Sequence, residues 1–345
     1  MSVSRKYTGF AIALAWPETY CKQPGSWYDP VTGWLGISKN NYYKAGHAAL
    51  VLINKEEQKC HYFDFGRYHA PFQHGRVRSA EADHELKMFT RPVISGNGRE
   101  IVNFDEILAE LQNNDACHGE GLLYASYAEI NFEKAWKKAI RMQEASPLPY
   151  GPFVNRGSNC SRFVNTVILA GKPSLNRKIR LKYFVPLTPT PMNNVNSLGS
   201  KKAAPKLTPW KPFIPQRKLA KNELTSNLPA PVRHPEIPQN AQWLSGEGAG
   251  SWFVVEHIET FLQVTRYSPS GKKECLGYFG NTNGKTLDTG KSLQIIHPSN
   301  CRSIRLRIGD EEISFERIRD DSLKLNKNQK SVIGSERQCR ATHSP

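Results

Sequence analysis

The chain has 345 residues, enough for about two domains that each bury a hydrophobic core of their own. Its formal net charge is +16, but twelve Lys and Arg residues and no Asp or Glu fall between Lys172 and Asn222. No aromatic RNA-binding motif or recognition helix accompanies this stretch. We therefore expect a solvated basic linker rather than a nucleic-acid-binding face.

The seven cysteines are widely spaced and form no CxxC pair, which argues against a disulfide framework and a zinc finger. His69 and His74 lack the carboxylate spacing of a zinc site, so we expect neither a metal nor a cofactor. No segment has the ~20 apolar residues that cross a bilayer, and the apolar run 10–16 lacks a leader cleavage site. We expect a cytoplasmic protein, or one exported without a classical signal peptide; the sequence does not indicate an oligomeric state.

The first half of the chain alternates strand patterns with helical periodicity. Strands are predicted at residues 7–16, 47–53, 60–65 and 121–130, with a hairpin turn at 55–58. Helices are predicted at residues 80–88, 104–112 and 131–144, and from Asn159 to Gly171, where Pro173 follows. This half is therefore predicted to be an α+β domain.

A change of composition marks the main boundary. Twelve of the 23 prolines lie between Pro173 and Pro238, a density that favours extended segments, although Trp210, Phe213 and Ile214 could anchor part of them. Beyond them, short strands are predicted at residues 251–261, 262–267, 274–279, 292–297, 303–308 and 312–317. We predict a first domain at 1–185, a basic Pro-rich linker at 186–246, a small all-β domain at 247–319 and a disordered tail at 320–345.

Cys160 is the candidate nucleophile. It follows Asn159 at the start of a predicted helix, where the helix dipole and free backbone N–H groups favour a thiolate. The same N–H groups could stabilise an oxyanion. The alternative is that Cys160 is a small buried residue of a core helix. Cys21 competes as a nucleophile, but it lies in an irregular segment with no helix start behind it.

His47 opens an apolar strand, and the following strand offers a polar group to orient its imidazole. If residues 54 and 59 pair, Asp64 shares the face of His47, whereas an odd loop brings His61 to that face. We favour Asp64, because a carboxylate fixes the tautomer and stabilises the imidazolium. His61 stays open as the alternative.

The order of these residues resembles that of a known superfamily. A His at a strand start, a polar residue on the next strand and a much later Asn-Cys-x-x-Phe-Val helix are similar to the circularly permuted papain-like hydrolases, which include NlpC-type cell-wall peptidases and lecithin:retinol acyltransferase-like proteins. The resemblance covers residues 40–170. It implies an antiparallel sheet packed on helices, with Cys160 as nucleophile, His47 as base and Asp64 or His61 as the orienting group.

The residues around Cys160 bear on the reaction. The run Asn-Cys-Ser-Arg departs from the Asn-Cys-Glu-His of the acyltransferase branch and is closer to the bacterial hydrolases. We therefore predict an amidase or peptidase that works through a thioester, with peptides, amides or peptidoglycan fragments as substrates. Residues predicted to bind the substrate are Asn159, Ser161, Tyr150 and Trp16. The alternatives are a non-catalytic binding protein on the same scaffold and a lipid acyltransferase.

The loop of residues 16–34 is rich in aromatic side chains and could be a lid or wall of the cleft, or could pack its own aromatic cluster. Residues 67–76 combine aromatic with basic side chains and could line the substrate cleft or form a solvent-facing connection.

Overall fold

A computed structural model describes residues 7–23, 29, 38–205, 213–258, 261–281 and 292–318. The chain forms two compact units, one of Met1–Arg233 with Trp243–Ser251 and the other of His234–Gln242 with Trp252–Pro345. Most of the aromatic residues of the 16–34 loop, Trp210 and the predicted tail lie outside the described residues.

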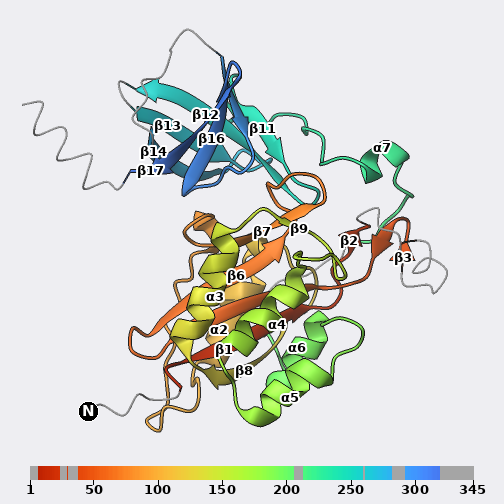
Figure 1. Ribbon diagram of the computed structural model, residues 1–345, viewed down its shortest axis with the longest axis vertical. Coiled ribbons are helices and arrows are strands. Elements are labelled where there is room, and N and C mark those ends of the chain that lie inside the picture. The colour runs from red at the N-terminus through yellow and green to blue at the C-terminus, as the bar shows by residue number, and fades with distance from the viewer. Residues whose placement is uncertain are drawn as a thin grey trace, which may run out of the picture. The chain divides into compact units, whose positions relative to one another are not determined.

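The first unit is built on a seven-stranded sheet in which all pairs of neighbouring strands are antiparallel (Figure 1). Its order is β10 (Lys202–Ala203), β8 (Tyr124–Ile130), β1 (Gly9–Trp16), β5 (His47–Asn54), β6 (Lys59–Gly66), β7 (His74–Ser79) and β9 (Leu148–Pro149). A separate small sheet has the order β2 (Cys21–Lys22), β4 (Tyr42–Tyr43) and β3 (Ser38–Lys39).

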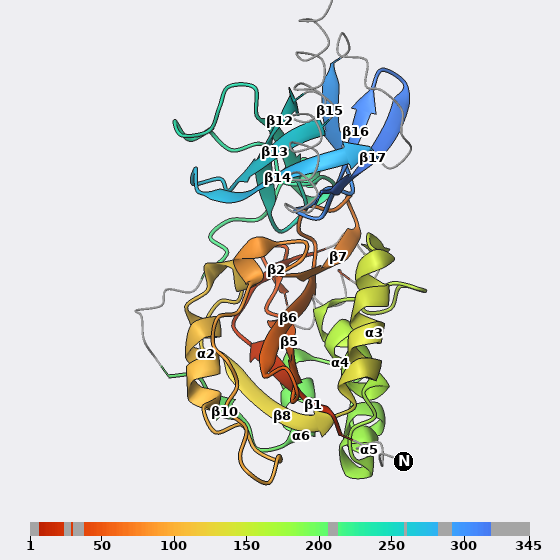
Figure 2. The same ribbon diagram turned by 90° about the vertical axis from the view of Figure 1, so that its left-hand side faces the viewer.

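The central strand β1 is buried on both faces. Because side chains alternate along a strand, its two faces pack against different helices. Ala11, Ala13 and Ala15 share one core with α3 (Phe132–Glu144), α4 (Cys160–Ala170) and α6 (Pro191–Leu198). The larger Phe10, Ile12, Leu14 and Trp16 share the other core with α2 (Phe104–Gln112). Figure 2 shows α2 on one side of the sheet and α3 and α4 on the other. The small alanines allow the helix that carries Cys160 to lie close to the sheet.

The predicted helix at residues 80–88 is wrong. Only a 3-10 turn, η1 (His84–Leu86), forms there, and its preceding residue Asp83 is extended, with φ −143° and ψ 95°. The reason is a buried ion pair: the carboxylate of Asp83 accepts two hydrogen bonds of 2.6 Å from the guanidinium of Arg76. A second 3-10 turn, η2 (Asp115–Cys117), lies against η1.

Regular structure also occurs within residues 186–246, which the sequence indicated as a linker. The segment contains α6, β10 and the short helix α7 (Lys221–Leu224). Thr190 caps α6 by accepting a hydrogen bond from the N–H of Asn193, and Pro191 occupies the first turn. Val195 and Leu198 then pack into the core beside Phe163. The preceding helix, α5 (Leu175–Tyr183), was not predicted either.

The second unit carries most of a seven-stranded sheet; six of its strands agree with the short strands predicted in this region, and these six pair with one another in antiparallel fashion. The order is β11 (Gln242–Ser245), β12 (Gly250–Ile258), β13 (Phe261–Tyr267), β14 (Lys273–Asn281), β17 (Glu311–Arg317), β16 (Ser303–Ile308) and β15 (Leu293–Ile296). The side chain of Gln242 links the two ends of the order. It donates to the carbonyl of Leu293 at 2.7 Å and accepts from the N–H of Ile295 at 2.8 Å, so the sheet is nearly closed.

As the sequence predicted, the first unit combines helices with an antiparallel sheet. The second unit is built of strands. Among the residues described, no helix combines the length and the apolar character that a membrane span requires.

Candidate active site

The hairpin of β5 and β6 has the even register. Asn54 pairs with Lys59 and Ala49 pairs with Asp64, which places Asp64 on the face that carries His47. His61 lies on the opposite face, where its ring centroid is 4.8 Å from that of Trp136. The hairpin therefore brings Asp64, and not His61, to the side of His47.

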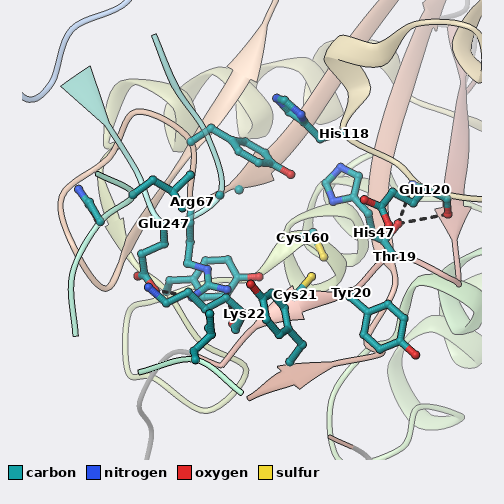
Figure 3. Close-up of a pocket in the computed structure, with 18 of the residues that line it drawn as sticks. Thr19, Tyr20, Cys21, Lys22, His47, Arg67, His118, Glu120, Cys160 and Glu247 are labelled. Carbon is teal, nitrogen blue, oxygen red and sulfur yellow. Dashed lines mark hydrogen bonds and ion pairs between the residues drawn. The ribbon is translucent and has the colours of Figure 1, made fainter. Parts of the chain in front are cut away.

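Cys160 and His47 meet at the edge between sheet and helix. Cys160 is the first residue of α4 and His47 the first of β5, and the imidazole and the thiol lie close enough for each to shift the pKa of the other. Figure 3 shows the ring and the sulfur facing one another. On the far side of the ring, Nε2 lies 3.7 Å from Oδ2 of Asp64. The three side chains form a row in the order thiol, imidazole, carboxylate.

The electrostatics of this row favour a charged pair. Burial favours the neutral imidazole, but Asp64 and the Cys160 sulfur outweigh it and raise the pKa of His47 to about 9. Burial likewise opposes ionisation of Cys160, but His47 and the backbone N–H of Ala48 lower the pKa of its thiol below the ordinary value. Both shifts favour the thiolate–imidazolium form of the pair over the neutral form.

Asp64 is itself held in place on both carboxylate oxygens. Arg78 on β7 donates from Nε to Oδ1 at 2.9 Å and from its terminal nitrogen to Oδ2, and the Tyr62 hydroxyl donates to Oδ2 at 3.0 Å. Burial favours the neutral acid, but Arg78 and His47 hold the pKa of Asp64 well below its usual range. The carboxylate therefore stays ionised and in a fixed position beside the imidazole.

The start of α4 supplies a second electrostatic element. Asn159 is extended, with φ −134° and ψ 176°, and its side-chain oxygen accepts a hydrogen bond of 2.8 Å from the N–H of Arg162. Arg162 in turn donates to the carbonyls of Gly151, Pro152 and Val154, which fixes the loop before the helix. Cys160 lies at this positive end of the helix dipole, where backbone N–H groups that Asn159 does not engage could stabilise a developing oxyanion.

A cavity of about 700 Å³ opens onto this row. Its lining includes His47, Cys160, Cys21, Tyr150 and His118. Burial, with the charge of Cys160, raises the pKa of Cys21 to about 12, so Cys21 stays a neutral thiol. Burial, with the charge of Arg78, lowers the pKa of His118 to about 3, so its ring is neutral. Of these four cysteine and histidine residues in the cavity wall, the Cys160–His47 pair is suited to nucleophilic chemistry.

Residues 11–176 match the model of the type VI secretion system effector TseH-like family. This TseH-like segment starts in β1 and ends in α5, so it contains all three residues of the row. Residues 241–318 match a second family, described as the DUF6695 C-terminal domain. The crystal structure of the type VI secretion system effector TseH is similar with a TM-score of 0.37 and 19% sequence identity, over 55% of this chain and 87% of that one. No curated protein matches the chain.

Of the four residues expected to bind the substrate, three lie at the cavity region. Tyr150 lines the main cavity, and Asn159, Ser161 and Cys160 line an adjoining hollow of about 440 Å³. Trp16 lies elsewhere: its side chain is 1% exposed and stacks on the His47 ring, with the centroids 5.8 Å apart. It ends the core strand β1 and packs against the imidazole, and it is not among the residues that line either cavity.

A charged wall of the cavity was not anticipated from the sequence. Arg67 donates to Oε2 of Glu247 at 2.6 Å, and Lys22 lies 3.9 Å from the same oxygen and donates to the carbonyl of Ser226 at 2.8 Å. Glu247 lies outside the TseH-like segment, 180 residues after Arg67. The basic composition of loop 67–76 indicated Arg67 as a possible cleft residue, but no pattern in the sequence indicated Glu247 as its partner.

The roles of Tyr62 and Arg78 were not anticipated. Tyr62 lies on β6, on the face of His47 that the even register predicts, and Arg78 lies opposite Asp64 on β7, which pairs with β6. Arg78 could not be found this way, because its strand β7 was read as a loop.

Proposed function

We propose that the first unit is a cysteine hydrolase of the circularly permuted papain-like type, which cleaves an amide bond through a thioester on Cys160. The observation that supports this most is the row of thiol, imidazole and carboxylate, in the chain order His47, Asp64, Cys160, with His47 and Cys160 in the wall of a cavity. In papain-like enzymes without permutation, the cysteine comes first.

In the proposed reaction, the Cys160 thiolate attacks the carbonyl carbon of the substrate. The oxyanion that forms accepts hydrogen bonds from the first turn of α4. The His47 imidazolium gives its proton to the leaving nitrogen as the C–N bond breaks, which leaves an acyl group on sulfur. A water molecule, deprotonated by His47, then attacks the thioester, and the carboxylic acid departs as Cys160 recovers its thiolate. Asp64 holds the ring and stabilises its cationic form.

We further propose that the substrate is a peptide or peptide-like amide of the bacterial cell wall and that the chain is delivered as a type VI effector. The resemblance to NlpC-type peptidases supports the first point. The match of the TseH-like segment supports the second, because the family is described as type VI secretion system effectors. Delivery by such a system would need no classical leader.

Incubation of the purified chain with muropeptides, followed by mass spectrometry of the products, tests this function. We expect new amine and carboxyl ends with the wild-type chain and none with Cys160→Ala. Cys60→Ala is the matched control, since Cys60 lies on β6 away from the cavity and burial raises its pKa to about 12. A chain whose Cys160→Ala variant retains full activity would exclude the proposed nucleophile.

Labelling with iodoacetamide at neutral pH separates the hydrolase from a non-catalytic protein on the same scaffold. We expect Cys160 to react faster than Cys60, because its thiol is partly ionised. Equal, slow labelling of both would favour the non-catalytic alternative. A stable lipid acyl chain found on Cys160 by mass spectrometry after incubation with phospholipids would favour the acyltransferase alternative.

A further inference from the structure

Helix α5 and the residues after it expose a group of large apolar side chains. Their exposed fractions are 71% for Leu175, 39% for Ile179, 67% for Tyr183, 71% for Phe184 and 95% for Leu187. We call these five residues the α5 ridge. Isolated exposed apolar side chains are common, but five within thirteen residues form a patch that calls for a partner.

The geometry of α5 places the side chains of the α5 ridge on the face of the helix that points away from the core. Leu175, Ile179 and Tyr183 are spaced by four residues, so they follow one another along a single face of α5. Leu181, on the other side of the helix, is 1% exposed and belongs to the core of the first unit.

Two arginines of α5 hold it against α6. Arg177 donates to the carbonyl of Leu198, and Arg180 donates to that of Asn196. Figures 1 and 2 both show α5 at the periphery of the first unit, next to α6. The ridge is therefore displayed on a fixed helix.

The charges around the ridge all have one sign. Lys178 and Lys182 flank it on one side and Arg180 on the other, and all three side chains are exposed. The sequence has no Asp or Glu from Lys172 to Asn222. At the start of α5, Lys172 lies close enough to Lys134 on α3 to lower the pKa of that ammonium, so cations also crowd this end of the helix.

We propose that the α5 ridge docks on the surface of an anionic lipid bilayer, with its apolar side chains in the acyl boundary and its cations at the headgroups. An apolar stripe flanked by Lys and Arg is the pattern of helices that lie in the membrane interface. The charge favours an anionic surface, because each Lys or Arg near such a leaflet strengthens binding. A nucleic acid would match the cations but leave the exposed leucines and aromatic rings without a partner.

This surface is separate from the proposed chemistry. The ridge residues are not among those that line the cavity of Cys160, and docking would hold the chain at a membrane surface. The inference stands whether or not the chain proves to be a hydrolase.

Vesicle flotation with the full chain tests the proposal. We expect the chain to float with vesicles of phosphatidylcholine and phosphatidylglycerol and to remain at the bottom with phosphatidylcholine alone. The triple variant Leu175→Ser, Ile179→Ser and Tyr183→Ser should bind the anionic vesicles roughly tenfold more weakly. The double variant Lys178→Glu and Lys182→Glu should lose a similar factor, since it reverses two charges.

Matched controls come from exposed residues elsewhere on the chain. Val93→Ser with Val102→Ser removes apolar side chains that are 52% and 66% exposed, and Lys272→Glu with Lys273→Glu reverses two exposed cations. Both controls should float like the wild-type chain. Circular dichroism melts of every variant verify that it is folded.

Two outcomes would overturn the proposal. One is that the wild-type chain binds no better to anionic vesicles than to neutral ones, which would leave an acidic protein as the partner to seek. The other is that the folded ridge variants float as well as the wild-type chain, which would assign lipid binding to another basic segment.

Discussion

The His47 imidazole is fixed by contacts on three sides. Trp16 stacks on its face at 5.8 Å between centroids, Asp64 lies at Nε2, and the Cys160 thiol completes the row. Arg78 and Tyr62 then fix the carboxylate. Preorganisation of this kind lowers the cost of reaching a reactive geometry, because the groups need not be oriented when substrate binds.

The loss of activity at alkaline pH should follow the deprotonation of His47. The thiolate–imidazolium pair exists only while His47 holds its proton, so kcat/KM should fall with a midpoint near the His47 pKa of about 9. In Asp64→Asn, the lost negative charge no longer stabilises the imidazolium, so the midpoint should move to lower pH. A pH profile of hydrolysis from pH 5 to 10 measures both; an unchanged alkaline limit in Asp64→Asn would contradict the role given to Asp64.

His61→Ala provides the contrasting result. The His61 ring packs edge-on against Trp136 on the other face of the sheet, so its removal should leave kcat/KM within about twofold of wild type. The free energy of unfolding should fall by about 1 kcal/mol through the lost aromatic contact. Urea unfolding and steady-state kinetics test the two expectations. A large loss of activity with unchanged stability would revive His61 as the orienting group.

For individual site residues, the sequence predicts what local patterns indicate and no more. The nucleophile and base could be proposed from their local settings, a helix start and a strand start. Asp64 was favoured over His61 on chemical grounds alone, because the geometric choice depends on the parity of the 54–59 turn, and a one-residue shift exchanges the two faces of the strand.

At the scale of elements, the start of α4 matters most. The Asn159 side chain caps the helix at the N–H of Arg162, and Cys160 follows directly. The cap defines the first turn, and the first turn positions both the thiol and the N–H groups beside it.

Removal of this cap should affect stability and reactivity together. Asn159→Ala should lower the free energy of unfolding by about 1 kcal/mol. It should also raise the pKa of the Cys160 thiol, since a frayed first turn aligns fewer N–H dipoles with the sulfur. Asn159→Ser, which keeps a capping oxygen, is the control and should stay near wild type in both. The rate of alkylation against pH reads the thiol pKa; no shift in Asn159→Ala would mean that His47 alone sets it.

Elements with clear periodicity were predicted well, and those fixed by distant partners were not. The strands β1, β5 and β6 and the helices α2 and α3 follow their apolar patterns. Residues 80–88 have helical periodicity, but the buried pair of Arg76 and Asp83 outweighs that local preference. Helix α6 was not predicted because prolines surround it, although Pro191 at its first turn is compatible with a helix start.

At the scale of the whole chain, sequence order and compact units do not coincide. Residues Trp243–Ser251 belong to the first unit although residues His234–Gln242 belong to the second. The returning segment docks on the stretch after β6: Gly248 donates to the Arg67 carbonyl at 2.9 Å, and a Cβ on Gly246 would lie 2.3 Å from that oxygen. No periodicity in the sequence records a contact between segments so far apart, which is why the predicted boundary at residue 247 falls inside this segment.

Glu247 places a buried negative charge in the returning segment. Its side chain is fully buried and balances two buried cations, Arg67 and Lys22, while Oε1 accepts a hydrogen bond of 2.9 Å from the N–H of Gln73. Glu247→Gln would leave Arg67 buried without a counter-charge, and a broken buried pair typically costs about 3–5 kcal/mol. We expect a loss of that order in the free energy of unfolding, measured by urea denaturation.

Two further variants separate this charge effect from a general loss of packing. Glu236→Gln, at an exposed position, should leave stability within about 0.5 kcal/mol of wild type. Adding Lys22→Met to Glu247→Gln removes one of the two uncompensated cations, so part of the lost stability should return. Burial already lowers the pKa of Lys22, which shows that its charge is costly at this position even with Glu247 present. A double variant less stable than Glu247→Gln alone would mean that Lys22 contributes through its hydrogen bond to Ser226 rather than through its charge.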